Sequence, residues 1–296
     1  MMHLFSGRAK RLLCYPGAVL ILALGGLVLR PLCTSVRTHE LQAGLQLPLP
    51  ATTDNLSKQL AIFSLGGLRT LAAEILAMDA TSAWLQQDWT RARNRWEQIT
   101  TLCPQRASYW NRAARDMSKN AVAFVNSRKE LSEHQRATMA QEYLDSAEQF
   151  YLQGIVHNPS NVLLQLDLAA FYEDLARRPQ FGKAVAAYEA ALQKGASEMY
   201  RRWVFYNLCR IRGREHEAWE LGRQLFAQKR HHTPSVRCLL FVLQHKLALP
   251  AEQRFSVSQL FGSEEKACKQ LRPYLHNTLR FPVNGVAEYL RSHRIP

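Results

Sequence analysis

The sequence predicts an all-α chain, in which one N-terminal transmembrane helix precedes a short, degenerate solenoid of helical repeats. Three observations predict it: a recurring residue spacing, a composition rich in helix-forming residues, and an apolar run near the N-terminus. The pattern starts with a small residue, which an aromatic residue follows after four positions and a second small residue after seven, so that all three share one helix face. A proline twelve positions after the first residue ends the helix. The occurrences of this pattern, in which Ile99 and Ala196 are departures, are Ala92, Trp96, Ile99 and Pro104; Ala147, Tyr151, Gly154 and Pro159; and Ala184, Tyr188, Ala191 and Ala196.

The apolar run, residues 12–29, carries no charge and is just long enough to cross a bilayer. Three basic residues in segment 1–11 precede it, and Arg30 and Arg37 follow it, which favours a cytoplasmic N-terminus and an exported remainder. No small-residue cleavage pattern follows the run, so we expect an uncleaved signal anchor, with a cleaved signal peptide and a soluble protein as alternatives. Residues 30–57 are rich in proline and polar residues and are predicted to form a linker.

Apolar residues at helical spacing predict repeats over 58–233 and a basic helical cap over 234–296. Pro104 and Pro159 are farther apart in the sequence than one helical repeat of usual length, by about 21 residues. We place the elbow between the helices that these extra residues form at 126–133. The expected helices are 60–86, 89–102, 108–124, one beginning at 131–133, 161–177, 181–194, 197–212, 215–228, 236–247, 263–272 and 283–293.

The recurring spacing resembles the second helix of tetratricopeptide-repeat (TPR) proteins, over about residues 60–230. The segments GGLRTLAAEILAMDATSAWLQQDW and WEQITTLCPQRASYW are similar, more narrowly, to bacterial membrane-anchored repeat proteins. This resemblance implies a location more than an activity. It also implies that the first helix of each pair lines a concave groove, in which we expect Asn111, Arg115, Glu173, Trp203, Asn207 and Arg210. A solvated groove without a dedicated ligand is the alternative reading of any one of these residues.

The net charge of +14 is concentrated at the two ends of the chain. Residues 61–200 carry fifteen basic and fifteen acidic residues, whereas residues 201–296 carry seventeen basic and seven acidic ones. An anionic partner is therefore best sought in the last third, where Arg201, Arg202, Arg212 and Arg214 form a candidate basic patch. The interleaved aromatic residues have core spacing, and nucleic-acid binding would need the arginines on one face.

The sequence contains no motif that carries a catalytic mechanism, so we expect no enzyme activity, cofactor, metal or small-molecule substrate. The six cysteines form no CxxC pair. Cys14 and Cys33 flank or enter the predicted anchor, and the other four are read mainly as small buried residues, with a Cys209–Cys238 bridge as the alternative in an exported domain. His231 and His232 are expected on an exposed turn.

These observations predict a non-catalytic membrane-anchored adaptor that binds a protein partner outside the inner membrane, in an envelope, pilus or secretion assembly. The alternative is a cytoplasm-facing module whose basic C-terminal third binds anionic lipid or nucleic acid.

Overall fold

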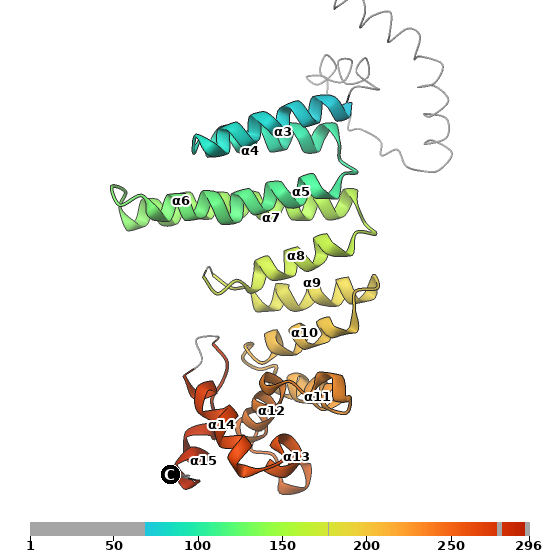
Figure 1. Ribbon diagram of the computed structural model, residues 1–296, viewed down its shortest axis with the longest axis vertical. Helices are drawn as coiled ribbons and strands as arrows, with labels where there is room; N and C mark the ends of the chain where they lie inside the picture. Colours follow the sequence, from blue (N-terminus) through green and yellow to red (C-terminus); the bar gives the residue numbers. More distant parts are fainter. Residues whose placement is uncertain (1–68, 177, 277–279, 294–296) are drawn as a thin grey trace, which may run out of the picture. The chain divides into compact units, whose positions relative to one another are not determined.

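The computed structural model describes residues 69–176, 178–276 and 280–293, and these residues form helices and connecting turns without any strand (Figure 1). The predicted anchor at 12–29 and the linker at 30–57 lie outside the described residues. Among the described helices, none combines the length and the apolar character needed to cross a membrane. The chain divides into two compact units, Met1–Leu76 and Ala77–Pro296, and everything below concerns the second unit and helix α3, which crosses the boundary.

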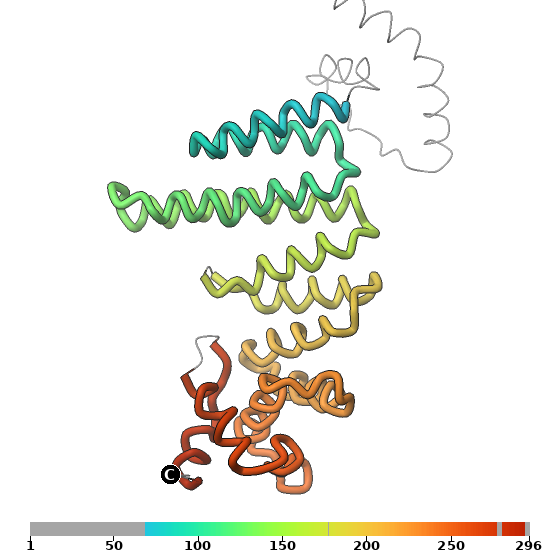
Figure 2. The backbone as a smooth tube through the Cα atoms, in the orientation of Figure 1, coloured from blue at the N-terminus to red at the C-terminus, as the bar shows by residue number. Residues whose placement is uncertain are grey.

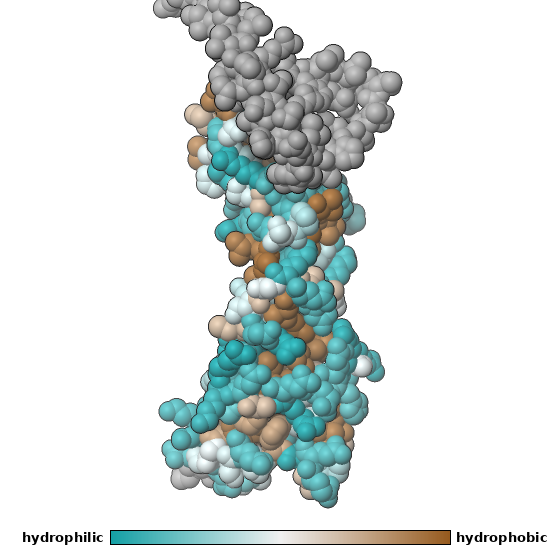
Figure 3. All heavy atoms as spheres, turned by 90° about the vertical axis from the view of Figure 1, so that its right-hand side faces the viewer, coloured by the Kyte–Doolittle hydropathy of each residue, from teal (hydrophilic) through white to brown (hydrophobic). Residues whose placement is uncertain are grey.

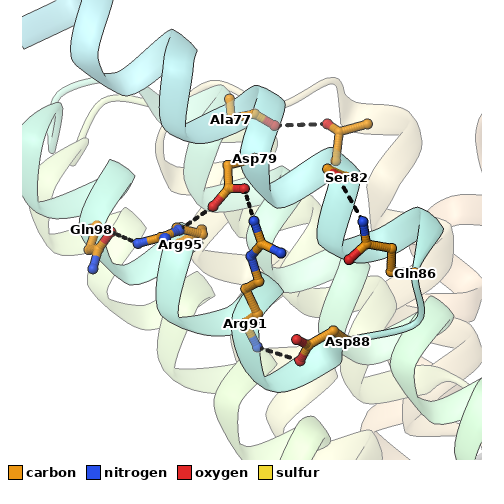
Figure 4. Close-up of polar contacts among 9 residues, drawn as sticks. Ala77, Asp79, Ser82, Gln86, Asp88, Arg91, Arg95 and Gln98 are labelled. Atoms are coloured by element: carbon orange, nitrogen blue, oxygen red, sulfur yellow. Dashed lines mark hydrogen bonds and ion pairs between the residues drawn. The ribbon is translucent and has the colours of Figure 1, made fainter.

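Helices α3 (Arg69–Leu85) and α4 (Trp89–Leu102) are joined by a short turn. Gln87 has a positive φ of 60° in this turn, and the Asp88 side chain begins α4 by accepting a hydrogen bond from the Arg91 backbone N–H at 3.0 Å. Arg91 and Arg95 of α4 both donate to the Asp79 carboxylate of α3 (Figure 4). This pair of contacts fixes the two helices against each other at a partly exposed position.

The inserted residues form a long helical hairpin. Its first arm is α5 (Ala107–Arg115), a π-helical segment η3 (Asp116–Ala121) and α6 (Val122–Ser127), and its second arm is α7 (Glu133–His157). Ser132 and Gln135 form a reciprocal capping box that begins α7, so the elbow predicted at 126–133 matches the turn between α6 and α7. The sequence pattern did not predict the π segment. A small apolar cluster of Val122, Val125 and Ala140 holds the far end of this hairpin together.

Two further helical pairs follow. The first is α8 (Val162–Glu173) with α9 (Phe181–Gln193), and the second is α10 (Arg201–Leu208) with α11 (Glu215–Phe226). Both first helices are shorter than expected: α8 ends at Glu173 and not at Arg177, and residues 198–200, which precede α10, form a 3-10 turn. Successive helices pack against each other from α7 to α12, and the tube in Figure 2 shows the pairs following one another along this unit.

The small-and-aromatic spacing marks the buried side of the second helix in each pair. Trp96, Tyr151 and Tyr188 are at most 3% exposed, and the residues three positions later, Ile99, Gly154 and Ala191, are also buried. Helix α11 buries a further aromatic and small residue at this spacing, Trp219 and Gly222, which were not predicted from the sequence. An aromatic residue followed three positions later by a glycine was the available signal.

The C-terminal part consists of short helices around α12 (Pro234–Lys246), whose two ends are exposed and whose middle, residues 236–244, is mostly buried. The C-terminal part also contains the 3-10 turns η5 (Lys229–His231) and η6 (Ala251–Gln253), and helices α13 (Val257–Phe261), α14 (Glu264–Leu275) and α15 (Val286–Ser292). Thr233 caps α12 through its side chain and Pro234 occupies the first turn, which explains where the helix begins.

In this part the structure corrects one sequence-based expectation and decides between two readings of the cysteines. His231 is not on an exposed turn: it is 1% exposed because the η5 turn folds it inward, and its Nδ1 atom has no hydrogen-bond partner among the described residues. The described cysteines, Cys103, Cys209, Cys238 and Cys268, are all free thiols, so Cys209 and Cys238 form no bridge in this structure. The last three of these are buried, as expected for small core residues.

Candidate partner-binding groove

The first helices of successive pairs, α5, α8 and α10, line two pockets, which together we call the groove. Pocket 1, of about 600 Å³, lies between the α5–η3 arm and the beginning of α8 and includes Asn111 and Arg115. Pocket 2, of about 280 Å³, lies between the end of α8 and α10 and includes Glu173, Trp203 and Arg210. The structure therefore brings five of the six predicted groove residues to two neighbouring places and not to one.

Pocket 1 also contains charged residues that the sequence reasoning missed, namely Arg112, Asp116 and Lys119. Lys119 follows Arg115 by four positions and so shares its side of the helical arm, and this spacing was the signal that could have found it. The π segment begins at Asp116, and such segments inside α-helices are frequent at functional sites.

Hydrogen bonds hold in place the carboxylates of Asp116, which lines pocket 1, and of Asp167 on α8. The Trp96 indole N–H donates to Asp116 Oδ2 at 3.0 Å, the Asn120 amide donates to Asp116 Oδ1 at 3.1 Å, and the Asn111 amide donates to the Asp167 carboxylate. Burial raises the pKa of both Asp116 and Asp167 above its usual value. Asn111 is thus engaged with α8, and it connects the α5 and α8 walls.

The cationic side chains at pocket 1 are exposed. Arg112 donates to Thr81 Oγ1 at 3.1 Å and lies 5.3 Å from the centre of the Trp96 ring. Arg115 and Lys119 are exposed and form no ion pair with any residue that the structure describes. Their charges are therefore available to an anionic group of a ligand.

Pocket 2 is built around the Glu173 carboxylate at the end of α8. Tyr188 donates its hydroxyl to Glu173 Oε1 at 3.0 Å and Asn207 donates its amide to Glu173 Oε2 at 2.7 Å. Burial, reinforced by the charge of Glu173, raises the pKa of the Tyr188 hydroxyl far above its usual range, which keeps it protonated as a donor. Glu173 consequently joins α8, α9 and α10.

Arg210 completes this network. Its guanidinium lies 5.2 Å from the centre of the Phe181 ring and 4.1 Å from that of Phe281, and burial lowers its pKa while the nearby Glu173 opposes that shift. Asn207 is fully buried and does not line either pocket, so the expectation that it faces the groove is wrong. Its amide is needed inside the stack because Glu173 and the Trp203 backbone carbonyl both accept from it.

The candidate basic patch does not form one surface. Arg201 and Arg202 begin α10, whereas Arg212 and Arg214 follow its C-terminal end, so the length of the helix separates the two pairs by more than about 10 Å. Two of the four charges are also paired locally: Arg201 with Glu198 at 3.3 Å and Arg214 with Glu217 at 2.5 Å. The local helix geometry thus divides what the sequence presents as a cluster.

Among the described residues, no three His, Cys, Asp or Glu side chains gather to hold a metal ion. On the face shown in Figure 3, hydrophilic residues predominate over the second unit and apolar residues appear only in small groups. A scan against protein-family models gave no match, and a search of curated proteins found no match either.

Proposed function

We propose that this protein is a non-catalytic, membrane-anchored, TPR-like adaptor that binds a segment of a partner protein in the groove. The observation that carries the proposal is that both pockets lie on first helices and share the α8 wall. Stacked helical pairs present such first-helix surfaces to extended ligands, and pockets rich in arginine and asparagine offer hydrogen bonds to peptide groups and carboxylates.

The membrane part of the proposal depends on the uncharged run at 12–29, which would hold the chain in the inner membrane with its N-terminus in the cytoplasm. The helical pairs would then bind their partner on the outer side, in an envelope, pilus or secretion assembly. A reporter fused to the C-terminus tests the orientation: alkaline phosphatase activity supports export, and fluorescence of a cytoplasmic reporter without phosphatase activity contradicts it.

The alternative, a cytoplasm-facing module that binds anionic lipid or nucleic acid, receives less support. It requires the arginines of the last third to act together, and the four candidate arginines lie at opposite ends of α10 with two of them in ion pairs.

Photo-crosslinking in native membranes tests partner binding directly. A photoreactive residue at position 115 or 203 lies in a pocket, and the same residue at position 212 is the matched control, because Arg212 is exposed and lines neither pocket. We expect one discrete protein adduct from positions 115 and 203 and none from position 212. Equal adducts from all three positions, or none from the two groove positions, would contradict the proposal.

A further inference from the structure

Helix α8 connects the two pockets along one of its faces. Leu163 at its beginning lines pocket 1, and Ala170 and Asp174 at its end line pocket 2. These residues are spaced by seven and four positions, so they share one helix face. Leu163 is 67% exposed and Ala170 is also exposed, while Asp167, which lies between them on this face, is partly buried and accepts a hydrogen bond from Asn111.

The two ends of this face carry opposite charge. Three cations, Arg112, Arg115 and Lys119, line pocket 1 together with one carboxylate, Asp116. The carboxylate of Asp167 on α8 is the second acidic group there, since the charges of Arg115 and Lys119 act on it, and the cations still outnumber the acids. Two carboxylates, Glu173 and Asp174, line pocket 2 together with a single cation, Arg210. Apart from Arg210, these charged residues all lie in 61–200, where basic and acidic residues are equal in number, so their separation is a matter of placement and not of composition.

The backbone of α8 adds to the same polarity. The N-terminal end of a helix carries about half a positive charge and the C-terminal end about half a negative charge. Pocket 1 lies at the N-terminal end of α8, beside Asn161 and Leu163, and pocket 2 lies at its C-terminal end. Side-chain and backbone charges therefore have the same sign at each end of the groove.

The length of α8 sets the spacing of a ligand. From Leu164 to Glu173 the helix rises by about 14 Å, at about 1.5 Å per residue. An extended peptide covers that distance in about four residues, at about 3.3 Å each.

We propose that the groove recognises an extended partner segment with an acidic and a basic side chain about four residues apart, the acid beside Arg115 and Lys119 and the base beside Asp174. This inference rests on the proposed function and names the ligand chemistry of the same groove. The ion pairs form at exposed or half-exposed positions, so they select the ligand and orient it, while the peptide backbone and the contact with Leu163 supply further affinity.

Selection from a displayed random twelve-residue peptide library tests the proposal on the full chain in detergent micelles. We expect enriched sequences to contain an acidic and a basic residue separated by three to five positions. Their binding should weaken when the salt concentration rises from 50 to 500 mM, because the charges lie within reach of solvent ions.

Matched variants then locate the binding site of one selected peptide. The double variant Arg115→Glu, Lys119→Glu should bind this peptide at least tenfold more weakly. A second peptide, in which lysine replaces the acidic residue, should recover most of the lost affinity for the double variant. Asp174→Asn should weaken the original peptide about threefold to tenfold. It keeps an acceptor for the Ala176 backbone N–H, which now donates to Asp174 at 3.0 Å, so the turn is preserved. Arg212→Glu should leave binding unchanged.

The outcomes separate the inference from the proposed function. Peptides that lose affinity with the Arg115 and Lys119 changes but lack the paired charges would overturn the inference and leave the groove as a binding site. Peptides that are insensitive to every groove substitution, or a selection without any enriched binder, would overturn both.

Discussion

Gly154 of α7 lies directly against the side chain of Trp110 on α5, so closely that a Cβ atom on Gly154 would be 2.7 Å from Trp110 Cβ and 2.9 Å from its Cγ. Real Cβ atoms do not approach so closely, and neither backbone can yield without moving a whole helix. The small residue predicted seven positions after the first one therefore packs against a specific residue across the hairpin, Trp110. Gly222 meets Phe205 and Leu240 in the same way, with the nearest atom at 2.7 Å.

Gly154→Ala should lower the free energy of unfolding by about 1–3 kcal/mol, because the added methyl group overpacks the contact with Trp110. Urea unfolding followed by circular dichroism measures this. Gly182→Ala is the control: Gly182 also lies in a helix, α9, and an added Cβ would meet nothing within 4 Å. Its stability should be unchanged or higher by up to about 1 kcal/mol. An equal loss in both variants would mean that the close approach to Trp110 does not limit this position.

Glu173→Gln should lower the free energy of unfolding by about 1–3 kcal/mol, because Tyr188 and Asn207 would lose a charged acceptor and the half-buried Arg210 would lose its neighbouring negative charge. Glu217→Gln is the comparison, since it removes an exposed pairing with Arg214 whose typical contribution is about 0–1 kcal/mol. Chemical denaturation of both variants decides the matter. A smaller loss for Glu173→Gln than for Glu217→Gln would show that pocket 2 tolerates an uncompensated arginine.

Asp79 should support the fold at neutral pH and lose this effect in acid. Hydrogen bonds from Arg95 and Arg91 hold the pKa of its carboxyl below the usual 3.8. A lowered folded-state pKa contributes stability above the unfolded value, and that contribution disappears as the pH falls through the folded value. The stability difference between the wild type and Asp79→Asn should therefore shrink as the pH is lowered below about 4 in urea titrations. A difference that stays constant down to pH 2.5 would contradict the ion-paired geometry.

The contribution of Asp116 to stability should depend on pH in the opposite direction to that of Asp79. Burial raises the pKa of its carboxyl above the usual 3.8, so the folded chain holds this proton more tightly than the unfolded chain. Its contribution to stability then falls as the pH rises from below 3.8 through the raised value. Asp116→Asn keeps an acceptor for the Trp96 indole, and relative to the wild type it should gain stability between pH 3.5 and 7. A relative loss over that interval would show that the Trp96 and Asn120 hydrogen bonds outweigh burial.

The buried thiols should resist alkylation. Burial raises the pKa of the Cys238 thiol to about 12 and that of Cys209 further still, so neither forms appreciable thiolate near pH 8. Iodoacetamide should label the partly exposed Cys103 in the folded chain, and Cys209, Cys238 and Cys268 only in denaturant. Peptide mass mapping without reductant gives the answer. A linked pair of peptides containing Cys209 and Cys238 would establish the bridge that the structure lacks.

Deletion of residues 1–30 tests the predicted anchor. The buried residues that the structure describes run from Ala73 to Val286, so we expect the shortened chain to remain helical and to be extracted without detergent. Far-ultraviolet circular dichroism and fractionation of the two forms measure this. Loss of the helical signal, or continued membrane association of the shortened chain, would place the anchor or part of the fold elsewhere.

The sequence by itself determined the helices, because helix formation depends on contacts between residues three and four positions apart. The buried faces around Trp96, Tyr151 and Tyr188, the elbow at 126–133 and the beginning of α7 all follow from such local spacing and from capping side chains. It also identified five of the residues that line the two pockets, Asn111, Arg115, Glu173, Trp203 and Arg210, since the groove-facing positions of a first helix repeat at the same spacing.

The tertiary structure alone decided which of those residues meet. Asn207 turned inward because Glu173 of a different helix accepts from it, His231 was buried by the η5 turn, and the four candidate arginines were divided by the length of α10. The opposite charges of the two pockets likewise come from segments more than 40 residues apart, brought together by stacking. No local pattern encodes such pairings, because packing between helices depends on the whole surfaces that meet and not on the spacing within one of them.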